Sequence, residues 1–355
     1  MTRLRRSDTS APGLRRVPRG WGFQYIAPGG GRPAPADLDR IQRLVIPPAW
    51  TDVWICPLAN GHLQATGVDA AGRRQYIYHP AWRERRDREK HDHVLQVAQG
   101  LPAARETAGE HLHGRGLSQE RVLAAAFVLL DIGLFRAGGD RYAEENGSYG
   151  LMTLEREHVH CGKSGLTFEY PAKSGKERMH VVAAPPVCGV ITSLRRRRSP
   201  GQRLLAFTSG GQWHELDSDD LNDYLRELFG RDVSAKDFRT WHATAMAAVG
   251  LAVSSHAATS PTARKRAVSR VVAEVAGHLG NTPAVCRRSY IDARLIDRFL
   301  DGEVVSLPMD QLGADVPPGW PATRGEIETA VIKLLLTGST GAVGAPRTGR
   351  NRRSA

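Results

Sequence analysis

The 355-residue sequence has few cysteines and no long apolar run. Its four cysteines are widely separated and none belongs to a CxxC pair, which predicts reduced thiols. The longest apolar run, residues 122–135, contains Asp131 and is too short to span a bilayer. The basic N-terminus lacks a following apolar segment, which argues against a signal peptide. These absences predict a soluble protein of the cytoplasm.

Two common ligand sites are incomplete in the sequence. Gly162-Lys163-Ser164 imitates the end of a P-loop, but Glu157 stands where the first glycine is required. His158, His160 and Cys161 follow an alternate-strand spacing and lack a fourth ligand. The sequence therefore predicts neither a nucleotide site nor a metal site in this region.

Acidic residues are outnumbered by basic ones, 37 to 49, and the net charge is +12. Residues 1–19 hold six arginines and one aspartate, and residues 337–355 hold four arginines and no acid. This excess predicts a polyanionic partner. Because most of the excess lies near the two ends, it explains non-specific attraction and leaves the specific site to be found by motif.

Composition and periodicity divide the chain into four segments. We expect a disordered basic tail over residues 1–19, because arginine, serine and proline dominate there. Short alternating runs separated by turns predict a small antiparallel β domain over residues 20–90. A mainly helical domain with a small β-hairpin sheet is expected over residues 91–307, and an extension with one helix and a basic tail over residues 308–355. The fold class is therefore α+β.

The stretch GNTPAVCRRSY (280–290) joins a helix end, a turn and a tyrosine. Before it, residues 261–279 repeat an apolar residue at every fourth position, as a buried helix face requires: Ala267, Val271, Val275 and Leu279. A glycine then ends the helix, and a second helical run carries Tyr290 beside a pair of arginines. Such a phenol could be held near a phosphate. Taken alone, an amphipathic tyrosine on a basic helix is the simpler interpretation.

Other stretches carry residues suited to phosphodiester chemistry. Arg136 stands where an apolar helix ends in small residues, and Arg239 stands in the first turns of a capped helix. Lys173 and Lys176 lie at the tip of a predicted hairpin. Asn281 precedes the tyrosine by nine residues.

These residue types fit a metal-free attack on a phosphodiester. The attacking tyrosine must lose a proton, and the 5′-alkoxide leaving group must gain one. Two arginines can donate charge-assisted hydrogen bonds to the phosphoryl oxygens. An amide adds a neutral donor, and a lysine supplies the proton to the leaving group.

With these residues the chain resembles the poxvirus-like, bacterial branch of the type IB DNA topoisomerases over nearly all of residues 20–305. Five motifs occur in the right order with compatible gaps, which makes the resemblance highly specific. In chain order they are GRRQYIYHP (72–80), LFRAGGDRY (134–142), YPAKSGK (170–176), KDFRTWHAT (236–244) and GNTPAVCRRSY (280–290).

The resemblance implies a mechanism and a role for each site residue. Tyr290 would be the nucleophile that forms a 3′-phosphotyrosine link, Arg136 and Arg239 would bind the phosphoryl oxygens, and Lys173 would be the general acid. Asn281 stands where much of the family has a histidine, although bacterial members can carry asparagine. The implied activity is relaxation of supercoiled DNA by single-strand cleavage, rotation and religation, with no ATP, metal or other cofactor.

The resemblance also implies that the β domain closes on double-stranded DNA as half of a C-shaped clamp formed by a monomer. Residues of relatives that match Gln75, Tyr76 and Tyr78 contact DNA. Strand alternation places Gln75 on the face opposite the two tyrosines, so all three share one groove only with a twist or a bulge. A core role for Tyr78 fits equally well. The enzyme would be cytoplasmic and associated with the nucleoid.

Two rival functions stay open. A tyrosine recombinase uses similar chemistry, but it usually has a histidine three residues before the second arginine, where this chain has Lys236, and a helical N-terminal domain. A non-catalytic DNA-binding protein is disfavoured, because all five reactive positions keep competent side chains.

Overall fold

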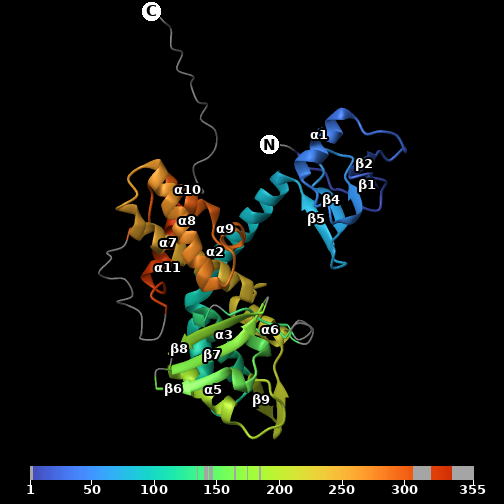
Figure 1. The fold of residues 1–355 in the computed structure, drawn as a ribbon. Helices are drawn as coiled ribbons and strands as arrows, with labels where there is room; N and C mark the ends of the chain where they lie inside the picture. Colours follow the sequence, from blue (N-terminus) through green and yellow to red (C-terminus); the bar gives the residue numbers. More distant parts are fainter. Residues whose placement is uncertain are drawn as a thin grey trace, which may run out of the picture. The chain divides into compact units, whose positions relative to one another are not determined.

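The computed structural model describes residues 3–133, 135–139, 143, 147–163, 165–173, 175–183, 185–306 and 321–337. The chain divides into two compact units, of which the first ends at Asp92 and the second begins at His93. This division falls inside helix α2 (Pro80–Leu112). The first unit holds an antiparallel sheet, and the second is mainly helical with small antiparallel sheets, which confirms the expected α+β class (Figure 1).

The first unit is built on a five-stranded antiparallel sheet with strand order β2-β1-β3-β4-β5. Its strands are β1 (Leu14–Arg19), β2 (Gly22–Ile26), β3 (Thr51–Ile55), β4 (Leu63–Val68) and β5 (Arg74–Tyr78). Helix α1 (Pro35–Leu44) packs Ile41 against Leu14, Ile55 and Ala65. Strands β3 and β4 lie on either side of the Asn60-Gly61 turn.

Residues 3–19 do not form the disordered tail that their composition predicted. The last six of them form β1, which lies between β2 and β3 in the sheet. Buried Arg16 donates hydrogen bonds to the backbone oxygens of Ile46 and Trp50 at 3.2 and 2.6 Å. An arginine can follow an apolar surface with its stem and bond carbonyls with its head, so an arginine-rich segment can still form an internal strand.

The second unit packs its elements around one large apolar core. Its further α-helices are α3 (Gln119–Gly133), α5 (Pro185–Arg196), α6 (Ser218–Phe229), α7 (Ala235–Ser255), α8 (Pro261–Leu279), α9 (Pro283–Ser289), α10 (Ala293–Asp301) and α11 (Glu326–Leu336). Short 3₁₀ turns are η1 (Leu151–Thr153) and η2 (Arg156–His158). Among its described residues the strands form a sheet of order β6-β7-β8 and a β9-β10 hairpin: β6 (Val159–Gly162), β7 (Gly165–Ala172), β8 (Lys176–Val182), β9 (Ala206–Ser209) and β10 (Gln212–Glu215).

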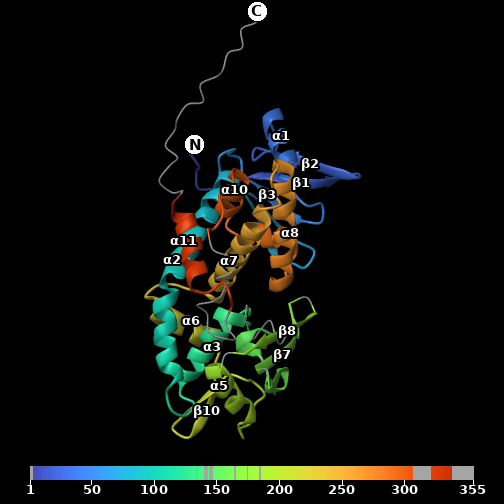
Figure 2. The same cartoon turned by 90° about the vertical axis from the view of Figure 1, so that its left-hand side faces the viewer.

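Within this unit the elements gather in two groups (Figures 1 and 2). The three-stranded sheet packs with α3 and α5, whereas α7, α8 and α10 pack on one another and α11 packs on α7. Among the described residues, no helix is both long and apolar enough to cross a membrane.

Local capping sets the ends of the helices that carry the candidate site. The carboxylate of Asp237 accepts hydrogen bonds from the N–H and O–H of Ser234 at 2.9 and 2.8 Å, at the start of α7. Helix α8 buries the four apolar residues that its periodicity predicted. It ends at Gly280, whose φ of 64° lies in the left-handed region, and the next N–H, that of Asn281, bonds back to the Ala276 oxygen at 2.9 Å.

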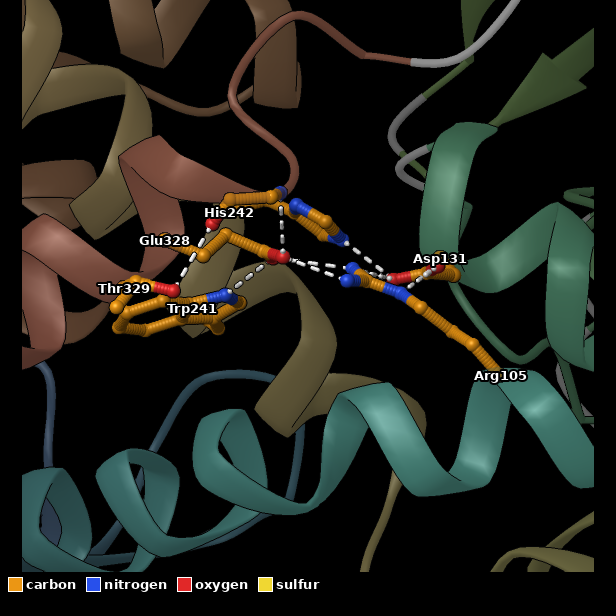
Figure 3. A network of polar contacts seen from close by, with 7 residues as sticks. Arg105, Asp131, Trp241, His242, Glu328 and Thr329 are labelled. Carbon is orange, nitrogen blue, oxygen red and sulfur yellow. Dashed lines mark hydrogen bonds and ion pairs between the residues drawn. The ribbon is translucent and has the colours of Figure 1, made fainter. Parts of the chain in front are cut away.

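A buried ion network joins four helices of the second unit (Figure 3). Arg105 of α2 donates to both carboxylate oxygens of Asp131 on α3, at 2.7 and 2.9 Å. It also donates to both oxygens of Glu328 on α11, at 2.5 and 3.0 Å. On α7, the indole N–H of Trp241 donates to Glu328 at 2.9 Å, and His242 Nε2 lies 3.5 Å from Asp131 Oδ1. His242 is thus a buried structural histidine.

The charges of this network are stabilised by one another. Burial lowers the pKa of Arg105, but the two carboxylates raise it further, and the net pKa is above its ordinary value. Burial likewise raises the pKa of Asp131, and the attraction of Arg105 and His242 brings the net pKa below its ordinary value. Removing one partner would leave a buried charge without compensation.

Helix α11 is part of the main core and lies C-terminal to the tyrosine motif. It lies in the segment 308–355, for which one helix was expected. Ile327, Val331 and Leu335 are buried in the same core as α7. The expected basic tail after residue 337 lies outside the described residues.

We predict that Glu328→Ala lowers the free energy of unfolding by about 3–5 kcal/mol, because it leaves Arg105 with one buried acid and removes the acceptor of the Trp241 indole. Urea unfolding followed by circular dichroism measures this loss. Glu274→Ala is the control, since this exposed acid lies 3.9 Å from Arg270 on α8 and should cost less than about 1 kcal/mol. Equal losses in the two variants would show that the network does not hold these helices together.

Candidate active site

Tyr290 directly follows the short helix α9. Thr282 caps this helix by accepting from the Val285 N–H, and a proline occupies its first turn. The backbone N–H of Tyr290 donates to the Cys286 oxygen at 3.0 Å, and the backbone oxygen of Tyr290 accepts from the Thr244 hydroxyl at 3.3 Å. The backbone on both sides of the half-buried phenol is therefore held in place.

Arg239 is buried next to this tyrosine. Its guanidinium carbon lies 5.5 Å from the centre of the Tyr290 ring, and its Nη2 donates to the Leu279 oxygen at 2.8 Å. Burial lowers the pKa of Arg239 to about 10; the charge of Arg136 acts in the same direction and Tyr290 opposes it. This arginine is still charged at neutral pH, so a permanent cation stands beside the phenol.

Arg136 and Asn281 are joined directly. Arg136 Nη2 donates to Asn281 Oδ1 at 2.7 Å. This contact orients the amide. A guanidinium carries only donors, so the amide oxygen rather than its nitrogen must face Arg136. Asn281 Nδ2 is enclosed and has no hydrogen-bond partner within the described part of the chain. The amide therefore keeps a donor that a ligand could use.

The predicted general acid is not hydrogen-bonded to these four residues within the described part of the chain. Lys173 is exposed immediately after β7, and Lys176 is exposed at the start of β8. No hydrogen bond or ion pair among the described residues connects Lys173 with Tyr290, Arg136, Arg239 or Asn281. The structure therefore brings together four of the five predicted catalytic residues, all except Lys173.

A third arginine near the site was missed by the sequence reasoning. Arg178 of β8 donates from Nη1 to the Gly277 oxygen at 3.4 Å and from Nη2 to the His278 oxygen, both in the last turn of α8. Burial lowers the pKa of Arg178 and the charge of Arg136 adds to this lowering, while the charge of Arg178 contributes to the lowered pKa of Arg239. No local sequence pattern identifies the helix that Arg178 meets, because its partners lie about a hundred positions away.

His180 lies two residues further along the same strand. Its ring centre is 4.8 Å from that of Phe135 and 6.1 Å from that of Tyr170. Burial lowers the pKa of His180 to about 4, and the charges of Arg178 and Arg239 contribute to the lowering. This histidine is therefore neutral at physiological pH and adds no cation to the site.

The three N-terminal candidates lie on β5 in the first unit. The rings of Tyr76 and Tyr78 are stacked with centres 6.2 Å apart, and Tyr76 is 47% exposed. Gln75 points to the opposite face and donates to Asp69 Oδ2 at 2.9 Å. A register irregularity does occur between β4 and β5, but it lies near Tyr78 and leaves Gln75 and Tyr76 on opposite faces.

One group of possible metal ligands differs from the set weighed in the sequence. Glu155, Glu157 and His158 place ligand atoms within 4.8 Å of one another. His158 Nδ1 accepts from the Glu155 N–H at 3.0 Å, which occupies one of its two ring nitrogens. His160 and Cys161 do not belong to this group.

Two models of known protein families match this chain. The model for the N-terminal domain of bacterial DNA topoisomerase IB matches residues 22–69. The model for the catalytic core of eukaryotic DNA topoisomerase I matches residues 79–297, more than half of the chain. The chain belongs to the type IB DNA topoisomerases. This confirms the resemblance inferred from the motifs and makes the protein an enzyme of the isomerase class.

Viral and plant relatives agree with this assignment. The topoisomerase is 27% identical to DNA topoisomerase 1B of Acanthamoeba polyphaga mimivirus over 262 residues, which cover 72% of this chain and 77% of the viral protein. It is 20% identical to DNA topoisomerase I of Monkeypox virus over 266 residues, 74% and 81% of the two chains. DNA topoisomerase 1 of Daucus carota is 30% identical over 129 residues, 36% of this chain and 15% of the plant protein.

The matched regions contain most of the motifs. Four of the five motifs lie inside residues 79–297, whereas GRRQYIYHP (72–80) falls largely between the two matches. Helix α11 of this topoisomerase lies beyond both.

We predict that His180 makes the enzyme less stable at mildly acidic pH. Its pKa is about 4 in the folded chain and has its ordinary value of 6.5 when unfolded, so the unfolded state binds more protons between these values. The stability contributed by neutral His180 is present above pH 6.5 and is lost as the pH falls to 4, by up to about 3 kcal/mol. Urea unfolding at several pH values measures this slope.

His180→Phe should flatten that part of the profile while keeping the contact with Phe135. His160→Phe, which removes an exposed histidine from β6, is the control. An unchanged slope in His180→Phe would assign the acid sensitivity to other groups.

Proposed function

We propose that this topoisomerase relaxes supercoiled double-stranded DNA through a covalent 3′-phosphotyrosine intermediate on Tyr290, without ATP or a metal ion. One observation carries the proposal: a buried, permanently charged Arg239 stands 5.5 Å from the Tyr290 ring, and Arg136 is close enough to repel it. Positive charges held together in this way are stabilised by a bound anion. A phosphodiester beside the phenol supplies that anion.

Four residues besides Tyr290 take part in the proposed reaction. The Tyr290 phenol gives its proton to solvent water and attacks phosphorus, while Arg136 and Arg239 donate to the non-bridging oxygens. Asn281 Nδ2 adds a neutral donor. The bond from phosphorus to the 5′ oxygen breaks, and Lys173 gives that oxygen a proton. Religation reverses these transfers after the free strand has rotated, and the phosphotyrosine bond conserves the energy of the broken diester.

The first unit supplies the rest of the DNA contact in this proposal. The stacked faces of Tyr76 and Tyr78 lie against the duplex, and the monomer closes around it as a clamp. Gln75 reaches the same duplex only if it leaves Asp69, its present hydrogen-bond partner. The enzyme works in the cytoplasm, associated with the nucleoid.

One assay separates this function from its two rivals. Supercoiled plasmid is incubated with the enzyme and EDTA. Relaxed topoisomers support the topoisomerase, exchanged strands support a tyrosine recombinase, and retardation without any change in linking number supports a DNA-binding protein.

We predict that Tyr290→Phe abolishes both plasmid relaxation and the covalent adduct, because it removes the attacking oxygen and nothing else. Duplex binding should stay within about twofold, since the arginines remain. Adducts trapped with detergent and resolved by electrophoresis give the measurement. Tyr149→Phe, which removes a hydroxyl that bonds Glu155, is the matched control and should relax DNA normally. An adduct in Tyr290→Phe would mean that another residue attacks.

We predict that Lys173, rather than Lys176, protonates the leaving group. Lys173→Ala should lose most cleavage of ordinary DNA and recover it on a 5′-bridging phosphorothiolate, because a thiolate leaves without a proton. Lys176→Ala should show a smaller defect that sulfur does not repair. Single-turnover cleavage rates on the two substrates decide the question. Equal slowing of Lys173→Ala on both would leave Lys173 as a phosphate-binding cation.

A further inference from the structure

Arg178 connects the β7–β8 hairpin to the segment that carries the nucleophile. Its two terminal nitrogens donate to the Gly277 and His278 oxygens, which belong to the last turn of α8. Carbonyl oxygens in the last turn of a helix lack helical partners and carry the negative end of the helix dipole. A guanidinium suits this position because its planar fork reaches two such oxygens at once.

Gly280 allows this approach. A β-carbon at Gly280 would lie 2.9 Å from Nη1 and 3.1 Å from Cζ of Arg178, closer than such atoms normally come. The same glycine has a φ of 64°, which also disfavours other residues. The backbone conformation therefore favours glycine at this position, and a β-carbon there would also require the Arg178 side chain to shift. Asn281 follows at once, and Arg136 bonds its amide.

The register of the hairpin places Arg178 close to its tip. Arg178 pairs with Tyr170, and the last pair before the turn is Ala172 with Lys176. Lys173 follows that last pair directly. Two residues of strand, roughly 7 Å, therefore separate the anchored position from the end of the ladder.

We propose that Arg178 is a positioning residue for the general acid: it fixes the β7–β8 hairpin on the end of α8, so that Lys173 is held at a defined place relative to Asn281 and Tyr290. The inference rests on the proposed function, since it assigns Arg178 a task in that reaction. Arg178 acts through Lys173 and does not itself touch the reacting atoms. Its charge also adds to the field of Arg136 and Arg239, which the experiment separates from its positioning role.

The test compares Arg178→Ala with Arg178→Lys on saturating DNA in single-turnover cleavage. Arg178→Ala should cleave ordinary DNA on the order of 10- to 100-fold more slowly, because a misplaced acid costs about that much. Most of the loss should disappear on the 5′-bridging phosphorothiolate. Arg178→Lys keeps the charge but cannot reach both carbonyls, so it should be slowed less and be repaired in the same way.

A double variant gives a second, independent readout. If Arg178 works through Lys173, then Arg178→Ala combined with Lys173→Ala should be no slower than Lys173→Ala alone. Arg195→Ala, which removes an exposed arginine from α5, is the control for lost charge and should cleave both substrates at the wild-type rate.

Three results would overturn the inference: wild-type rates in both Arg178 variants, equal slowing on the oxygen and sulfur substrates, or losses that multiply in the double variant. If Arg178→Ala does not fold, as judged by circular dichroism, Arg178→Lys alone decides between these outcomes. The wild-type enzyme in the same assay tests the proposed function separately. Absence of its Tyr290 adduct would reject that function, whereas a normal adduct with unaffected Arg178 variants would reject only the positioning role.

Discussion

The arrangement of the second unit depends on one buried cation, Arg105, and on the two acids that surround it. Asp131 comes from α3 and Glu328 from α11, while Trp241 on α7 shares the Glu328 carboxylate (Figure 3). Arg239 lies two residues before that tryptophan on the same helix. A displaced network would therefore move the helix that places a cation against Tyr290.

The candidate site uses arginine in the opposite way. In the network the pKa of Arg105 ends above its ordinary value, although burial opposes this, because acids surround it. At the site burial and neighbouring cations lower the pKa of Arg239. Arg136 and Arg178 direct donors to neutral oxygens of an amide and of α8. The buried network balances its own charges, whereas the candidate site has an excess of positive charge that a bound anion would neutralise.

The sequence predicted those parts of the site that depend on local rules. The buried stripe and glycine end of α8, the capped start of α7 and the order of the motifs were readable because each depends on residues a few positions apart. Arg178 was not readable in this way, since its partners lie about a hundred positions away. The same limit applied to β1, where arginine-rich composition concealed a strand that pairs with β3. The roles of Lys173 and of Gln75, Tyr76 and Tyr78 stay predictions.

The place of α11 in the chain has a consequence for how the enzyme is made. Arg105 and Glu328 are 223 positions apart, and Glu328 follows the tyrosine motif. A ribosome therefore completes every residue assigned to strand cleavage before it synthesises the acid that finishes the core. A nascent or truncated chain that stops after Tyr290 holds the full set of reactive side chains without the helix that secures α7. The helix that secures α7 is therefore synthesised only after the side chains of the proposed cleavage site.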